Sequence, residues 1–176
     1  MNSTRAIFSR ELKGFFNSPM AYIFLVIFAL VNGYFFTNTF FLFGQSDLRA
    51  LFDIVPLVYL FFIPAVSMGL ISREKSIGTM EIMATLPLSS FEFVMGKFLA
   101  ALSLILLALI STSIHFLTLL SVGTNVDHGA VLCGYLGLAL MGATYAAIGT
   151  YASSVTENQV VSFIIGVFIV LVFFML

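Results

Sequence analysis

Few side chains in this sequence combine the types and the spacing that chemistry requires. His115 lies close along the chain to the hydroxyls of Ser111, Thr112 and Thr118, and a histidine beside a hydroxyl is the core of nucleophilic catalysis. An ionisable group inside an apolar segment is a functional candidate, but a neutral imidazole bonded to Ser or Thr is also a common packing device. No paired motif accompanies His115, so we favour packing and keep an integral-membrane hydrolase as the weaker alternative.

A second group of residues offers metal ligands. Asp127, His128 and Cys133 supply three different ligand types, but no ligand motif repeats, so the sequence predicts no metal site. Cys133 is the only cysteine, which excludes a disulfide framework and a paired-cysteine site.

The pair Gly96-Lys97 is the only Gly-Lys dipeptide in the chain. A phosphate-binding loop needs a glycine five residues before such a pair and Ser or Thr after it, so that backbone N–H groups cradle the phosphates. Phe91 and Phe98 occupy those two positions, and the motif fails at both ends. We therefore expect no ATP hydrolysis by this chain, and we expect Lys97 to anchor the base of a membrane-spanning helix.

The composition indicates what kind of scaffold positions these residues. Of the 176 residues 61% are hydrophobic, and only seven are basic and eight acidic. A soluble domain is usually about half apolar and about a quarter charged, so a water-soluble globule of this size would have too little charged surface. We exclude a soluble enzyme, a nucleic-acid-binding protein and a disordered tail. The sequence predicts an integral membrane protein.

Five long runs of the chain carry no charge. Each is long enough for a helix that crosses about 30 Å of hydrocarbon, which takes about 20 residues, and a spanning chain must satisfy its own backbone groups. The expected fold is all-α and polytopic, one transmembrane domain over residues 1–176. The predicted spans are 19–42, 54–72, 98–122, 130–153 and 158–176.

The distribution of basic residues predicts the orientation. Six of the seven lie either ahead of the first span or in the 73–97 loop between the second and third spans, and only Arg49 follows the first span. Basic residues favour the cytoplasmic side of a membrane. We therefore expect the N-terminus to be cytoplasmic.

Residues 4–16 have an apolar stripe at helical spacing, formed by Phe8, Leu12, Phe15 and Phe16. Such a pattern predicts an amphipathic helix that lies in the membrane interface, although an ordinary polar flank is the alternative. Ser18 and Pro19 then suit the N-cap and the first position of the next helix.

The 73–97 loop is rich in charge and in helix-capping signals. Thr79 with Glu81 can open a short helix that Pro87 ends, and Ser89 with Glu92 forms a capping box for the next helix. The short helix carries apolar residues on a polar loop: Met80, Ile82, Met83 and Leu86. Two readings stay open, namely a helix that docks into another protein and a helix that rests on the membrane.

Prolines interrupt the second span. Pro56 and Pro64 bend a helix and free backbone groups that must face protein or a cavity. The second span is therefore a candidate wall for a transport path, with Tyr59, Phe62 and Ser67 as candidate lining residues. An apolar, aromatic path of this kind is consistent with a lipidic or amphipathic cargo, and a small or polar cargo stays the alternative.

Several short motifs resemble type-2 ABC exporter permeases over essentially the whole chain. They are Arg10-Glu11-Leu12, Phe16-Asn17-Ser18-Pro19, Arg73-Glu74-Lys75, Gly78-Thr79-Met80-Glu81, Leu86-Pro87 and Gly96-Lys97. The Gly-Thr-x-Glu, Pro and Gly-Lys pattern after the second span is the most specific of them. Among such permeases the sequence is most similar to the gliding-motility group of bacterial exporters.

The resemblance implies a machine of two permease copies, or two homologous permeases, with two cytoplasmic ATPase subunits in the bacterial inner membrane. ATP and Mg would then bind the ATPase, and this chain would hold no cofactor. An elbow helix maps to residues 4–16. The coupling helix maps to 78–87, with Gly78, Thr79, Met80, Glu81, Ile82, Met83, Leu86 and Pro87 as ATPase contacts. A second, smaller contact maps to Thr156, Glu157 and Asn158.

One departure from the family pattern concerns the number of spans. Such permeases generally have six spans, whereas this sequence predicts five, and we expect it to be a fragment or a split subunit. A membrane anchor or assembly subunit that recruits a cytoplasmic partner without transporting anything is therefore the main alternative. The sequence does not indicate the cargo.

Overall fold

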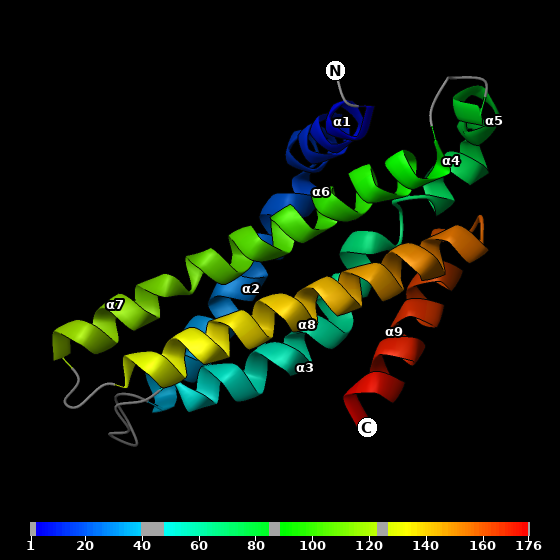
Figure 1. Ribbon diagram of the computed structural model, residues 1–176. Helices are drawn as coiled ribbons and strands as arrows, with labels where there is room; N and C mark the ends of the chain where they lie inside the picture. The colour runs from blue at the N-terminus through cyan, green and yellow to red at the C-terminus, as the bar shows by residue number, and fades with distance from the viewer. Residues whose placement is uncertain (1–2, 40–47, 85–88, 123–126, 176) are drawn as a thin grey trace.

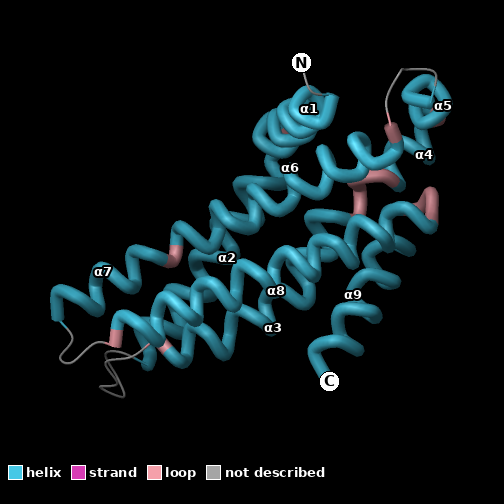
Figure 2. The backbone as a smooth tube through the Cα atoms, viewed as in Figure 1, coloured by secondary structure: helices cyan, strands magenta, loops and turns pink. Residues whose placement is uncertain are grey.

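The computed structural model describes residues 3–39, 48–84, 89–122 and 127–175, and the regular structure in these ranges is helical with no strand. Figure 1 and Figure 2 show the helices in chain order. Their bounds are α1 Ser3–Asn17, α2 Pro19–Thr37, α3 Arg49–Ser67, α4 Ser72–Ile77, α5 Thr79–Ala84, α6 Ser90–Ser111, α7 Ser113–Val122, α8 His128–Val155 and α9 Gln159–Met175.

Four helical segments in the described residues are long and apolar enough to cross a membrane. They are Pro19–Thr37, Leu51–Ile77, Ser90–Val122 and His128–Val155. The fifth predicted span is the apolar helix α9, which has 17 residues and is shorter than the usual length of about 20. The chain is a multi-pass membrane protein, and the prediction of spans is confirmed for the first four.

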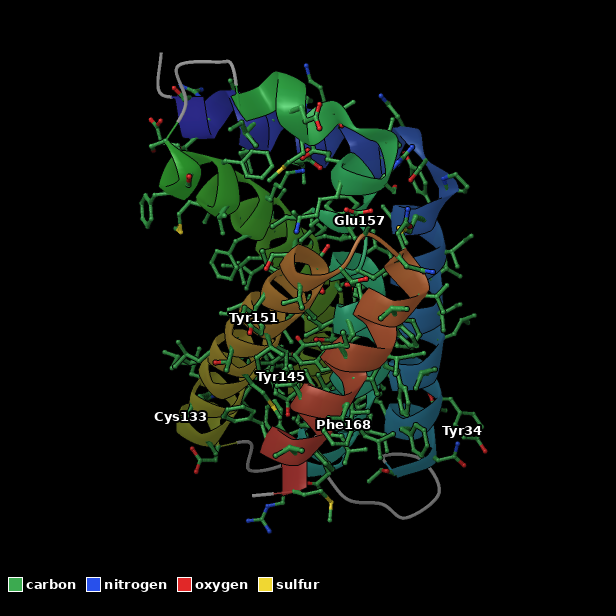
Figure 3. All side chains as sticks on the ribbon, turned by 90° about the vertical axis from the view of Figure 1, so that its right-hand side faces the viewer. Tyr34, Cys133, Tyr145, Tyr151, Glu157 and Phe168 are labelled. Atoms are coloured by element: carbon green, nitrogen blue, oxygen red, sulfur yellow. The ribbon has the colours of Figure 1, made fainter. Side chains whose placement is uncertain are left out.

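The long helices run side by side and α1 lies across one end of them (Figure 1). We call this end, which also carries α4 and α5, the α1 end. The opposite end, where α7 finishes and α8 begins, is the α7 end. Figure 3 places Glu157 near the α1 end, with Tyr34 and Cys133 toward the α7 end.

Close packing of α3 on α8 depends on glycine. A Cβ atom on Gly149 would overlap the hydroxyl of Ser67, and one on Gly142 would lie 3.3 Å from the ring of Tyr59. Small residues let membrane helices approach closely when no hydrophobic effect drives them together. Aromatic contacts fill the space between α2 and α3, where Phe28 stacks on Tyr59 with ring centroids 6.0 Å apart.

Several predicted helix boundaries shift in the structure. The helix α3 of the second span begins at Arg49, before the predicted residue 54, and the helix α6 of the third begins at Ser90, before the predicted residue 98. The capping box is confirmed, because the Ser89 hydroxyl accepts from the Glu92 N–H at 3.2 Å and the Glu92 carboxylate accepts from the Ser89 N–H at 3.2 Å. Capping signals therefore locate the start of α6 better than the charge-free run does.

A break at Thr112 divides the predicted third span into α6 and α7. The Thr112 hydroxyl donates to the Leu109 carbonyl at 2.7 Å and lies 3.1 Å from the hydroxyl of Tyr135 on α8. Threonine that bonds its own preceding turn commonly bends a helix. The break between α6 and α7 therefore lies at a hydroxyl contact with the neighbouring helix α8.

Candidate functional site

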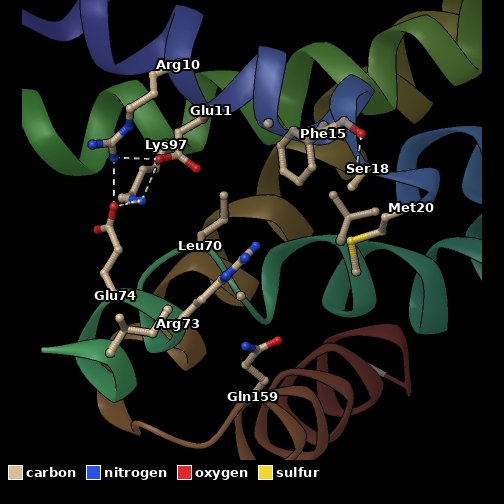
Figure 4. A pocket seen from close by; sticks show the side chains of 14 residues that line it. Arg10, Glu11, Phe15, Ser18, Met20, Leu70, Arg73, Glu74, Lys97 and Gln159 are labelled. Carbon is tan, nitrogen blue, oxygen red and sulfur yellow. Dashed lines mark hydrogen bonds and ion pairs between the residues drawn. The ribbon is translucent and has the colours of Figure 1, made fainter. Parts of the chain in front are cut away.

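Four charged side chains from three helices meet at the α1 end, and we call them the ion-pair cluster. Arg10 and Glu11 come from α1, Glu74 from α4 and Lys97 from α6 (Figure 4). Lys97 Nζ lies 2.9 Å from Glu11 Oε1 and 3.1 Å from Glu74 Oε1. Arg10 lies 2.8 Å from Glu11 Oε1 and 2.7 Å from Glu74 Oε1.

Burial makes the two ion pairs of Lys97 stronger than ordinary surface pairs, whereas the Arg10 side chain is 49% exposed. The Lys97 side chain is 1% exposed, and those of Glu11 and Glu74 are 19% and 14% exposed. Exposed pairs contribute little because water and salt screen them, whereas a buried charge is costly unless it is paired. Two cations and two carboxylates balance one another, so the cluster joins α1, α4 and α6 with no net charge.

The electrostatics of α1 reflect this arrangement. Burial alone would raise the pKa of Glu11, but Lys97 and Arg10 outweigh that effect and hold the pKa below its ordinary value. For Arg10, burial lowers the pKa, and the hydrogen bonds and charges of Glu11 and Glu74 raise it to a net increase. All of these shifts favour the charged, paired state.

A glycine lets α1 come close enough to form the cluster. A Cβ atom on Gly96 would lie 2.8 Å from Ile7 Cβ and 3.0 Å from the Thr4 carbonyl oxygen, and real side chains avoid such distances. Ile7 is the buried residue of α1. The Gly96-Lys97 pair therefore joins α1 to α6, with the glycine giving room and the lysine giving charge.

The predicted apolar stripe of α1 was incomplete. Phe15 and Phe16 pack against the core, and Phe8 and Leu12 are half-buried. Ile7, which sequence analysis missed, is the apolar residue that lies against Gly96 of α6. Its apolar type was visible, but only the position of α6 distinguishes it from the other apolar residues of the helix.

A second connection lies at the break between α3 and α4, which we call the α3–α4 junction. Ser153 on α8 accepts hydrogen bonds from the backbone N–H groups of Ile71 and Ser72, each at 3.0 Å. It also donates to the Met68 carbonyl at 2.8 Å. One buried hydroxyl thus satisfies backbone groups that the helix break would leave unpaired.

The loop between α8 and α9 is connected to the same junction. Lys75 on α4 donates from its ammonium group to the Ser154 carbonyl. Within the loop, Thr156 Oγ1 accepts from the Asn158 N–H at 3.2 Å, and the Asn158 side chain accepts from the Val160 N–H at 2.9 Å. Glu157 is exposed. The residues of the predicted second contact therefore closely follow Ser153 and Ser154, the α8 residues that bond to the α3–α4 junction and to α4.

The predicted coupling residues begin at a tight turn and continue into α5. Gly78 ends α4 with φ +78°, a left-handed conformation that suits glycine. The predicted cap at Thr79 is different in the structure. Thr79 is the first residue of α5, and its hydroxyl donates to the Glu74 carbonyl at 3.2 Å.

The remaining coupling residues differ in how they are placed. Met80 is half-buried against the core, and Glu81 is exposed. Ile82 and Met83 belong to α5, and Leu86 and Pro87 lie outside the described residues. A short helix, α5, is therefore present where sequence analysis predicted one, and its docking role stays a prediction. It follows a helix, α4, that sequence analysis did not predict.

The predicted path residues of the second span face other helices of this chain. Tyr59 and Ser67 are fully buried, and Phe62 packs on Phe24 with ring centroids 5.6 Å apart. The Ser67 hydroxyl donates to the Ile63 carbonyl at 2.6 Å.

The residues with catalytic or metal-binding types have structural partners. His115 stacks on Phe36 with ring centroids 4.6 Å apart, and the neighbouring Ser111 and Thr118 hydroxyls donate to carbonyls of their own helices. Asp127 caps α8 by accepting from the Gly129 and Ala130 N–H groups. The described residues contain no cluster of three or more His, Cys, Asp or Glu side chains suited to a metal.

Comparison with known proteins gives one match. A family model described as ABC-2 type transporter matches residues 2–176. No curated protein matches the chain, and no solved structure matches it.

Proposed function

Because the chain belongs to the ABC-2 type transporter family, whose membrane permease domains do not hydrolyse ATP themselves, we propose that it is the permease subunit of an ATP-driven exporter. In this proposal it pairs with a second copy or a homologous permease. Two cytoplasmic ATPase subunits bind ATP and Mg, and this chain couples to them through the 73–97 loop.

The observation that carries the proposal is the double attachment of α4. Glu74 on α4 joins the buried Lys97 of α6 and the Arg10 of α1, while the start of α4 is held by Ser153 of α8. A push on α5 would therefore pass to the spans α6 and α8 through buried polar contacts, and to α1 through Arg10, rather than through a flexible linker. A passive loop needs no such attachment.

The distribution of basic residues supports one orientation of the chain in the membrane. The α1 end carries six of the seven basic residues of the chain, and basic residues favour the cytoplasmic side. We assign the α1 end to the cytoplasm of a bacterial inner membrane. The coupling contacts on α5 and the second contact at Thr156, Glu157 and Asn158 then face the ATPase together.

Finer parts of the assignment rest on short motifs. Arg10-Glu11-Leu12 and Gly78-Thr79-Met80-Glu81 support the gliding-motility group of exporters. With α9 as a fifth span, and Tyr59, Phe62 and Ser67 of the second span beside the path, the path would be mostly apolar. The cargo in this proposal is lipidic or amphipathic.

The test is capture of the ATPase by the permease. The variant Glu81→Ala with Met83→Ala should recover at least about tenfold less ATPase than wild type when the complex is purified in mild detergent, because a few interface residues carry most of the binding energy. Ser76→Ala is the matched control, since Ser76 is exposed and its hydroxyl bonds only within its own loop. Full ATPase recovery with the double variant would show that α5 is not the docking element. A wild-type chain that brings no ATPase would instead support a membrane anchor or assembly subunit.

A further inference from the structure

A cavity of about 300 Å³ lies beside the ion-pair cluster, between α1, the start of α2, the α3–α4 junction and the start of α9. Figure 4 shows its lining side chains. Pockets for drug-sized ligands range from about 300 to about 1,000 Å³. This cavity is at the lower limit, so it suits a small polar group rather than a large organic molecule.

The side chain of one arginine in the cavity has no partner within the described part of the chain. Arg73 lies in the cavity lining, and its side chain points into the space between Leu70 and Gln159 (Figure 4). Its backbone carbonyl accepts from the Ser76 hydroxyl, but its side chain has no hydrogen bond or ion pair among the described residues. Its guanidinium group is therefore available to a ligand.

The other charged side chains around the cavity do not neutralise the charge of Arg73. Glu11 and Glu74 also line it, but Arg10 and Lys97 neutralise both carboxylates at 2.7 to 3.1 Å. Arg73 leaves a net charge of one positive unit on the lining. Planar guanidinium groups bind phosphate oxygens through two parallel hydrogen bonds.

Much of the remaining lining is apolar and lies at the boundary of the spans. These apolar residues are Phe15, Met20, Val66, Leu70 and Ile77, and Gly14, Ser18, Gly69 and Gln159 complete the lining. Met20 is the second residue of the first apolar helix, and α1 lies across the same end of the bundle. A cavity at this level lies where lipid headgroups meet the first methylenes of their acyl chains.

We propose that this cavity binds the phosphate group of an anionic phospholipid, with Arg73 as the donor and with Met20, Val66 and Ile77 against the glycerol and the first methylenes. The proposal uses the position of the cavity and its charge, and it does not depend on coupling to an ATPase. A bound lipid would contact both α1 and α4, so it would bridge the elbow and the start of the coupling loop.

The test measures binding of fluorescent short-chain phosphatidylglycerol to the purified full chain in a zwitterionic detergent. Wild type should bind it more tightly than phosphatidylcholine with the same acyl chains, because the choline cation is repelled by Arg73. Arg73→Gln should weaken phosphatidylglycerol binding by about tenfold, since it removes a charged hydrogen-bond donor. Lys13→Gln is the matched control on the exposed side of α1 and should leave binding unchanged.

A second variant tests the space rather than the charge. Gly14 lines the cavity, and a Cβ atom there would meet nothing within 4 Å. Gly14→Leu keeps every charge, suits a helix better than glycine does, and should still weaken lipid binding because the side chain fills the cavity. Equal binding by wild type, Arg73→Gln and Gly14→Leu would overturn the proposal.

Competition separates a lipid from a free anion. Inorganic phosphate and glycerol phosphate should displace the labelled lipid only weakly, because neither contacts the apolar wall. If inorganic phosphate bound as tightly as the lipid, the site would be an anion site and the lipid proposal would be wrong. Equal affinity for phosphatidylglycerol and phosphatidylcholine would overturn the selectivity for anionic headgroups.

Discussion

The hydroxyl oxygen of Ser153 lies 3.0 Å from the backbone nitrogen of Ser72, although 81 residues separate them in the sequence. The contact joins the end of α8 to the first residue of α4. It lies where the long helix that includes α3 breaks, and both residues are buried. The direction in which α4 leaves the membrane-spanning bundle therefore depends on a side chain of a different span.

Replacing Ser153 with alanine should loosen this junction. The backbone N–H groups of Ile71 and Ser72 would lose their acceptor, and an unpaired buried donor costs about 1–3 kcal/mol. We expect a lower melting temperature in detergent and lower ATPase capture together. The apparent melting temperature and the copurified ATPase measure the two effects.

Ser154→Ala is the control for that change. The Ser154 hydroxyl donates only to the Tyr151 carbonyl of its own helix, so its loss should affect neither measurement. A Ser153→Ala chain that melted like Ser154→Ala would show that the α3–α4 junction is held by other contacts.

Sequence reasoning found the features whose two partners lie close together in the chain. Pro19 occupies the start of α2 as predicted, and the Ser89–Glu92 capping box spans only three residues. In such motifs the residue types at fixed spacing specify both donor and acceptor. The four long apolar segments are equally local, because length and hydropathy alone define them.

The candidate site was less accessible because its contacts are long-range. Lys97 and Glu11 are 86 residues apart, and nothing in either residue type identifies the other as its partner. Short sequence motifs were also misleading where the same polar side chain can make either of two kinds of contact. Ser18 lies at the N-cap position of α2, but its hydroxyl donates to the Phe15 carbonyl. Asp127 was considered as a metal ligand, and it caps α8.

Membrane orientation can be tested by cysteine labelling in sealed cells, after Cys133 is replaced with serine. Ser121→Cys on α7 should react with an impermeant thiol reagent added outside, and Ser76→Cys at the α1 end should not. Both serines are exposed in the structure, so the comparison does not depend on burial. The reverse pattern would place the α1 end outside and would remove the basis for docking an ATPase there.

Lys97→Met should destabilise the α1 end more than the substitution of an exposed lysine does. Breaking a buried ion pair by removing one partner costs about 3–5 kcal/mol, because Glu11 and Glu74 would keep their charges close together. Lys13→Met is the matched control, since Lys13 is exposed on α1. We expect a clear loss of thermal stability in detergent with Lys97→Met alone, and equal melting of the two variants would contradict the ion-pair cluster.

The ion-pair cluster should lose stability at low pH and not near neutral pH. The pKa of Glu11 is lower in the folded chain than its ordinary value of 4.5 because Lys97 and Arg10 outweigh the effect of burial. Its stabilising contribution is therefore complete above that ordinary value and is lost as the pH falls through the lower folded-state pKa. Thermal melting should change little through Glu11 between about pH 8 and about pH 6 and should fall below about pH 4. In the Glu11→Gln variant, the fall in melting temperature below about pH 4 should be smaller than in wild type. If the variant and wild type show the same fall, another group is responsible for it.

Gly96→Ala tests whether α1 must lie tightly on α6. The added Cβ atom would lie 2.8 Å from Ile7 Cβ, and the nearby Thr4 carbonyl at 3.0 Å is backbone that cannot rotate away. Overpacking of this kind typically costs about 1–3 kcal/mol, and the displacement of α1 should also separate Glu11 from Lys97. Protease cleavage within α1 should therefore become faster. Gly14→Ala on α1 is the control, because a Cβ atom there meets nothing within 4 Å and alanine favours the helix by about 1 kcal/mol. Cleavage of Gly96→Ala at the wild-type rate would mean that α1 tolerates a wider separation from α6, and that the ion-pair cluster does not depend on this close contact.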